Sequence, residues 1–125
     1  MRAVPTKEFR TWFTNQNGDS RLVTVAMLDR LARIPTPPVE PSAELTQLRQ
    51  ARRHSLWRMR HAHIDELAVR LILWFPDEDP TTVYLLVGGD KTGLHDVWYD
   101  AATNRAEAMV DQLIRLRTTP KGLNQ

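Results

Sequence analysis

Residues Ser55 to Phe75, SLWRMRHAHIDELAVRLILWF, contain two segments with different β-strand patterns. Residues 56–62 alternate between two kinds of side chain, as expected of a strand whose successive residues point to opposite faces of a sheet. Val69 to Phe75 is an almost unbroken apolar run, which is typical of a central strand buried on both faces. With a short turn between them, the two segments predict an antiparallel β-hairpin.

Three arginines fall on this hairpin. Arg58 and Arg60 point to one side of the first strand, and Arg70 can join them from the second strand. Because burying an unpaired charge is costly, we expect this face to be open to solvent and able to receive an anion, which guanidinium groups bind in a bidentate fork. The alternative is a solvated basic face whose arginines pair with nearby acids. The acids in question are Asp65, Glu66 and Asp90.

The rest of the chain predicts an α+β fold. One helix begins at Pro5-Thr6 and a second spans residues 21–33, both before the hairpin. After the hairpin, the acidic turn 76–81 leads to a third strand over residues 82–88, and a closing helix spans residues 100–117. We expect two N-terminal helices packed on a small, mainly antiparallel sheet of three to four strands, on the face opposite the arginines, plus the C-terminal helix.

The predicted domain organisation is one domain over residues 1–125. Residues 35–42, PTPPVEPS, exclude a helix or a central strand and are expected to form a proline-rich internal linker on the surface. Neither side of this linker is large enough to fold alone, so it is not a domain boundary. Residues 43–53 are expected to form a short helical turn that leads into the sheet.

Composition excludes several classes of protein. The chain has no cysteine, and therefore no disulfide framework, thiolate metal site or cysteine nucleophile. No apolar run reaches the ~18 residues of a membrane span, and the N-terminus lacks the apolar region of a signal peptide. We therefore expect a cytoplasmic protein without membrane contact.

Charge is unevenly distributed, although the formal net charge is only +2. Residues 1–70 hold twelve Lys and Arg against seven Asp and Glu, whereas residues 71–125 hold five against eight. The sharpest basic block, residues 49–63, contains five arginines and no acid. Such a block can attract a polyanion through its local potential, which makes Arg52 and Arg53 candidate RNA-binding residues.

The segment after the third strand carries further candidates. Lys91 adds a cation close to the arginines, and residues 95–99, HDVWY, are expected to form an exposed connection. His95 is suited to proton transfer near pH 7 and Tyr99 to stacking on a base, whereas Trp98 is expected to anchor the last helix to the core. No metal or other cofactor is expected, because His61 and His63 lack a third ligand.

Three segments carry a resemblance to a known family. LWRMR (56–60), AVRLILWF (68–75) and LLVGGDKTGLHDVWYDAATNRAEAM (85–109) resemble the RelE-type toxins of the RelE/ParE superfamily of type II toxin–antitoxin systems, in their actinobacterial and phage branch. The order of the predicted elements, from Phe9 to about Leu116, is similar as well. The resemblance implies a metal-independent endoribonuclease that binds the ribosomal A site, cleaves mRNA by attack of the ribose 2′-oxygen, and has a cognate antitoxin.

The resemblance also implies roles for single residues. Arg70 falls at the family's phosphate-binding position, Arg58 and Arg60 at basic positions beside the scissile phosphate, Tyr99 near the aromatic residue that stacks on the cleaved nucleotide, and Lys91 at a basic residue after the third strand. The chain departs from the family at residues 92–95, TGLH, where many members have a further arginine; His95 is then the candidate acid. The alternative is a non-catalytic binding protein of this fold, encoded by a phage or prophage, that acts on a host protein such as gyrase or on nucleic acid.

Overall fold

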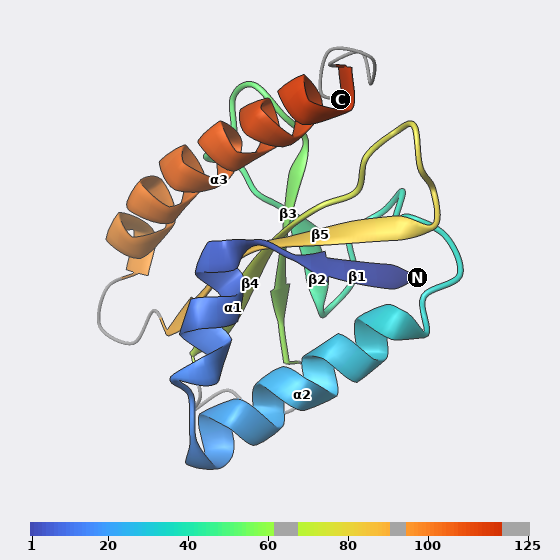
Figure 1. Ribbon diagram of the computed structural model, residues 1–125. Helices are drawn as coiled ribbons and strands as arrows, with labels where there is room; N and C mark the ends of the chain where they lie inside the picture. Colours follow the sequence, from blue (N-terminus) through green and yellow to red (C-terminus); the bar gives the residue numbers. More distant parts are fainter. Residues whose placement is uncertain (62–67, 91–94, 119–125) are drawn as a thin grey trace, which may run out of the picture.

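A computed structural model describes residues 1–61, 68–90 and 95–118, without the side chains of residues 95, 96 and 118. Within these ranges, three helices and five strands follow one another (Figure 1). They are β1 (Arg2–Pro5), α1 (Lys7–Thr14), α2 (Gly18–Ala32), β2 (Leu45–Gln47), β3 (Leu56–Arg60), β4 (Val69–Trp74), β5 (Thr82–Asp90) and α3 (His95–Thr118). No helix within these described ranges is long and apolar enough to cross a membrane.

The five strands form one mixed sheet in the order β1-β5-β4-β3-β2. Strands β2 to β5 pair antiparallel in sequence order, and β1 pairs parallel with β5. Helices α1 and α2 pack on one face of the sheet and α3 on the other (Figure 1). The predicted α+β class, the meander of β3, β4 and β5, and the two N-terminal helices are confirmed.

The two edge strands were not predicted. Residues 43–53 were expected to form a helical turn, but Leu45–Gln47 form β2, which pairs with β3 in the register Leu45↔Met59. This register directs Leu45, which is only 6% exposed, into the core between the sheet and α2. At the opposite edge, β1 contains Pro5, which an edge position tolerates.

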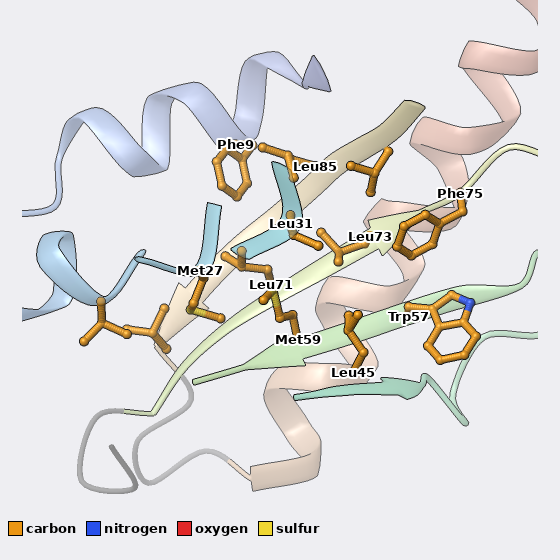
Figure 2. Close-up of a cluster of buried hydrophobic side chains, with 13 residues drawn as sticks. Phe9, Met27, Leu31, Leu45, Trp57, Met59, Leu71, Leu73, Phe75 and Leu85 are labelled. Carbon is orange, nitrogen blue, oxygen red and sulfur yellow. The ribbon is translucent and has the colours of Figure 1, made fainter. Parts of the chain in front are cut away.

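The core on the α1–α2 face is built from alternate strand residues. Leu71, Leu73 and Met59 project from β4 and β3 towards Phe9 of α1 and towards Met27 and Leu31 of α2 (Figure 2). All six of these side chains are at most 2% exposed. Burying a side chain of this size stabilises a fold by about 1.5–3 kcal/mol.

Helix α1 begins where predicted, because Thr6 caps it by accepting a hydrogen bond from the Phe9 N–H at 3.1 Å.

The second core lies between the sheet and α3. The register of β4 and β5 shifts between Ile72, paired with Val87, and Leu73, paired with Leu85, so that Leu86 is an extra residue in β5. Leu86 and Val87 therefore both face α3, as expected at a β-bulge. They contact the cluster formed with Leu56, Ile72, Tyr99, Ala102, Ala106 and Val110.

Gly88 and Gly89 lie on opposite faces of the sheet near the end of β5. A Cβ on Gly88 would lie 2.3 Å from Cε3 of Trp12, and a Cβ on Gly89 would lie 2.6 Å from Cζ2 of Trp98. The two glycines therefore allow two tryptophan rings, one from α1 and one from α3, to contact the backbone of β5. The prediction that Trp98 anchors the last helix to the core is confirmed.

The turn before β5 depends on Asp79. Its carboxylate accepts hydrogen bonds from the Thr81 and Thr82 hydroxyl groups, each at 2.7 Å, and from the Thr81 N–H at 3.1 Å. These hydrogen bonds lower the pKa of Asp79 from 3.8 to about 2. The stability that Asp79 contributes is therefore complete above pH ~4 and is lost as the pH falls towards 2.

We expect Asp79→Asn to flatten the dependence of stability on pH in this range, because the variant cannot take up the proton that the unfolded wild type binds. Urea unfolding midpoints measured between pH 2 and pH 5 test this. Asp77→Asn is the control, since the exposed Asp77 lies in the same turn. Equal pH profiles for wild type and Asp79→Asn would contradict the assignment.

A candidate anion-binding site

Arg58, Arg60 and Arg70 meet on the α3 face of the sheet. In the register of β3 and β4, Arg60 lies directly opposite Arg70 and Arg58 opposite Ile72. The three arginines line one small cavity of about 40 Å³ together with Ala43, Glu44 and Thr46. We call Arg58, Arg60 and Arg70 the arginine cluster. The prediction that they share one face of one hairpin is confirmed.

Arg60 and Arg70 form a cross-strand pair of like charges. Such pairs are unfavourable when they lie directly opposite each other, and an anion bound between them removes the repulsion. Arg60 is exposed and donates a hydrogen bond from Nε to the carbonyl oxygen of Ala43 at 3.1 Å. The pair therefore favours binding of a negatively charged group.

Arg58 and Arg70 are half-buried and use only part of their hydrogen-bonding capacity. Nε of Arg58 donates to Oγ1 of Thr46 at 2.7 Å, and Nη1 of Arg70 donates to the carbonyl oxygen of Val69 at 2.8 Å. Among the described residues, the remaining nitrogens of these two guanidinium groups have no protein acceptor. Because a guanidinium has five N–H donors, several are available to the oxygens of a phosphate.

The sequence led us to expect that the face carrying the arginine cluster is open to solvent, but this expectation is wrong. Helix α3 covers most of it, because Leu56 and Ile72 point to the same side as the arginines and need an apolar partner. The cluster occupies the part of the sheet next to the N-terminal half of α3, where Tyr99 lies. The accessible site is therefore a small cavity and not a broad basic surface.

Tyr99 has a different role from the one expected. Residues 95–99 do not form an exposed connection but the beginning of α3, five residues earlier than predicted. Tyr99 is 1% exposed, and its ring lies 5.3 Å below the guanidinium carbon of Arg58. In this position the ring cannot stack on a nucleotide; it supports Arg58 through a cation–π contact. The side chain of His95 and the whole of Lys91 lie outside the described residues.

Glu44 belongs to the site although the sequence did not point to it. Its carboxylate is the only one among the described residues that line the cavity of the arginine cluster. It forms an ion pair with Nε of Arg30 at 3.0 Å, and its carbonyl oxygen accepts the Arg60 N–H at 3.0 Å. Recognising β2 as the neighbour of β3 would have placed Glu44 beside Arg60.

Arg52 and Arg53 lie elsewhere, in the connection between β2 and β3. Their backbone N–H groups donate to the carboxylate of Glu107 at 3.1 and 2.6 Å, and Nη2 of Arg53 forms an ion pair with Asp111 at 2.8 Å. Neither residue lines the cavity of the arginine cluster. Arg53 thus holds the connection against α3, and Arg52, which is exposed, is a separate basic position.

Glu107 and Asp111 of α3 both have lowered pKa values. Burial of Glu107 acts to raise its pKa, but the backbone hydrogen bonds from Arg52 and Arg53 and the charge of Arg53 outweigh it, so that the pKa falls below its usual value. For Asp111, a hydrogen bond from His54 at 2.6 Å is the main cause, and Arg53 adds to it. Both carboxylates therefore stabilise the fold in their ionised form.

Within the described ranges, no group of three or more His, Asp or Glu side chains could hold a metal ion. His63, which the sequence analysis considered with His61 as a possible pair of metal ligands, lies outside the described residues.

Comparisons with protein-family models, with curated proteins and with solved structures found no match to this chain. The function must therefore be argued from the arginine cluster and its surroundings.

Proposed function

We propose that this chain is the toxin of a type II toxin–antitoxin module, a metal-independent endoribonuclease that cleaves ribosome-associated mRNA. The observation that carries the proposal is the arginine cluster, in which two half-buried guanidinium groups line a small cavity and have donors without an acceptor among the described residues. These three arginines are also the residues that the RelE resemblance assigns to the scissile phosphate. The geometry and the motif thus support the same chemistry.

In the proposed reaction, the arginine cluster binds the scissile phosphate. The ribose 2′-oxygen attacks phosphorus and the bond to the 5′-oxygen breaks, which leaves a 2′,3′-cyclic phosphate and a 5′-hydroxyl. The carboxylate of Glu44 accepts the proton of the 2′-hydroxyl, and His95 is the candidate donor of a proton to the 5′-oxygen. The arginines stabilise the additional negative charge of the phosphorane in the transition state.

Two partners follow from this proposal. The substrate is mRNA in the ribosomal A site, where the phosphate to be cut is presented to the arginine cluster. A cognate antitoxin protein would hold the toxin inactive, and acidic groups of the antitoxin would bind the cluster in place of phosphate. Arg52, outside the cluster, is available for a further contact with RNA.

One observation favours a second function. The only aromatic ring in contact with the arginine cluster among the described residues, Tyr99, is buried in the core and does not present a surface to a base. A non-catalytic protein of the same fold would need no such surface. The second candidate is therefore a binding protein, of phage or prophage origin, that acts on a host protein such as gyrase or on nucleic acid.

The test is a map of mRNA 5′ ends after brief induction of the wild type and of Arg60→Ala/Arg70→Ala. We expect new ends inside reading frames for the wild type and their loss in the variant, because removing two cations from the phosphate site lowers cleavage by at least about a hundredfold. Lys7→Ala/Arg10→Ala is the matched control, since it removes two exposed cations from α1 and leaves the cluster intact.

The outcomes separate the two functions. Growth arrest without new ends would reject the nuclease and favour the binding protein. New ends that persist in Arg60→Ala/Arg70→Ala, in a variant whose thermal midpoint shows that it is folded, would place the active site elsewhere. Growth without arrest in the wild type would reject the toxin itself.

A further inference from the structure

Three surface hollows meet at Glu44. The first is the cavity of the arginine cluster, the second, of about 250 Å³, lies between α2 and the end of β3, and the third, of about 450 Å³, lies between the end of α2 and the proline-rich linker. Glu44 lines all three, Arg60 the first two, and Arg30 the last two. Because neighbouring hollows share these residues, they adjoin one another around the β2 edge of the sheet, and together they form a bent surface groove. We call it the edge groove.

The charge of the edge groove is predominantly positive. Among the described residues, five arginines and one glutamate line it, and the glutamate is already paired with Arg30. The arginines are Arg30, Arg33, Arg58, Arg60 and Arg70. By contrast, the charged residues around a pocket of about 290 Å³ near the other end of β3 and β4 are of mixed sign, with Arg53 and Arg117 beside Asp77 and Glu78. The edge groove is therefore suited to a chain of negative charges.

The groove continues past the site where one phosphate would be cut. Arg30, on α2, and Arg33, the residue directly after α2, lie beyond Glu44 on the side away from Arg58 and Arg70. We infer that the edge groove binds single-stranded RNA, with the phosphates that flank the scissile one held by Arg30 and Arg33. This inference rests on the proposed function, because it assigns to the same substrate a second set of contacts.

The existing ion pairs of these two arginines do not oppose RNA binding. Arg30 pairs with Glu44 at 3.0 Å and Arg33 with Asp29 at 3.2 Å, but the two arginine side chains are 65% and 75% exposed. Exposed pairs of this kind contribute little to stability, and they exchange readily for a phosphate. A nucleic acid also releases counterions when it binds, which adds a favourable contribution at low salt.

The bend of the groove selects a flexible strand. A polyanion that contacts both Arg70 on the α3 face and Arg33 at the end of α2 must turn around the β2 edge. A nucleic acid duplex bends over such a short distance only at a high cost, whereas a single strand does so easily. The ligand we assign is therefore single-stranded and not duplex RNA.

Fluorescence anisotropy with uncleavable 2′-O-methyl RNA of four and of twelve nucleotides tests the inference. We expect Arg30→Ala/Arg33→Ala to weaken binding of the twelve-nucleotide strand about tenfold near 0.1 M salt, and to reduce the slope of log K against log salt by about 1.4, since each phosphate contact contributes about 0.7. Binding of the four-nucleotide strand, which fills only the arginine cluster, should not change. Lys7→Ala/Arg10→Ala should bind both strands like the wild type.

The failure of the inference differs from the failure of the proposed function. If Arg30→Ala/Arg33→Ala binds both strands like the wild type while Arg60→Ala/Arg70→Ala loses both, the phosphate site stands and the edge groove is rejected. If Arg60→Ala/Arg70→Ala binds the four-nucleotide strand normally, the phosphate site itself is rejected. Arg33→Glu, which keeps the Arg30–Glu44 ion pair, provides a second variant and should weaken the long strand more than Arg33→Ala.

Discussion

Replacing Glu44 with glutamine is expected to lower the rate constant for RNA cleavage by about a hundredfold or more, the contribution of a general base. The amide can still accept a hydrogen bond from Arg30, whose Nε lies 3.0 Å from the carboxylate, but it cannot take the proton of the 2′-hydroxyl. Single-turnover cleavage of a short RNA in a ribosome-programmed reaction measures this rate. Substrate binding should change little, because the arginine cluster is unaltered.

The conservative variant Glu44→Asp distinguishes a base from a structural residue. Aspartate keeps a carboxylate that can accept the proton of the 2′-hydroxyl, so Glu44→Asp should retain part of the cleavage rate that Glu44→Gln loses. Glu40→Gln, which alters an exposed acid of the linker, should cleave at the wild-type rate. Equal losses of rate in Glu44→Asp and Glu44→Gln would show that Glu44 positions Arg30 and Arg60 and is not the base.

Replacing Glu107 with alanine is expected to cost about 2–4 kcal/mol of the free energy of unfolding. Glu107 is 3% exposed and accepts the N–H groups of Arg52 and Arg53, which lose their acceptor in the variant. Each buried group left without a partner costs about 1–3 kcal/mol. Urea unfolding at pH 7 measures the loss.

A surface acid provides the comparison for Glu107. Glu78→Ala removes a carboxylate that is 79% exposed and pairs with Arg117 at 3.4 Å, so its effect should stay below about 1 kcal/mol. Because the pKa of Glu107 is lowered in the folded protein, its contribution is complete above the unfolded value of about 4.5 and is lost as the pH falls further. Equal losses for the two variants at pH 7 would contradict the role given to Glu107.

The parts of the fold that the sequence predicted well have strong local patterns. The alternation in β3, the apolar run of β4 and the long amphipathic helix α3 each extend over enough residues to show their period. β1 and β2, with four and three residues, are too short for this, and β2 is a strand only because it pairs with β3. Secondary structure that depends on a distant partner leaves little trace in its own residues.

The same distinction applies to the candidate site. Arg58 and Arg60 are two residues apart on one strand, so their common face follows from strand geometry alone. Glu44 reaches them only through the β2–β3 pairing, and no local pattern marks it. The prediction for Tyr99 was wrong for another reason. The last helix was expected to begin at residue 100, five residues too late, so Tyr99 was placed before it. In the structure Tyr99 begins the apolar row of α3 that continues with Ala102, Ala106 and Val110.

The adjacent glycines of β5 let two tryptophan rings approach the backbone beside the proposed active site. The ring of Trp12 lies against Gly88 on one side of the sheet, and the ring of Trp98 lies against Gly89 on the other. Gly89 is the residue paired in register with Arg70. Trp12 of α1 therefore contacts the strand that pairs with Arg70, from the face opposite the arginine cluster. In the proposed toxin, an antitoxin bound to the α1 surface would lie on the opposite side of the sheet from the arginine cluster and would leave the cluster unoccupied.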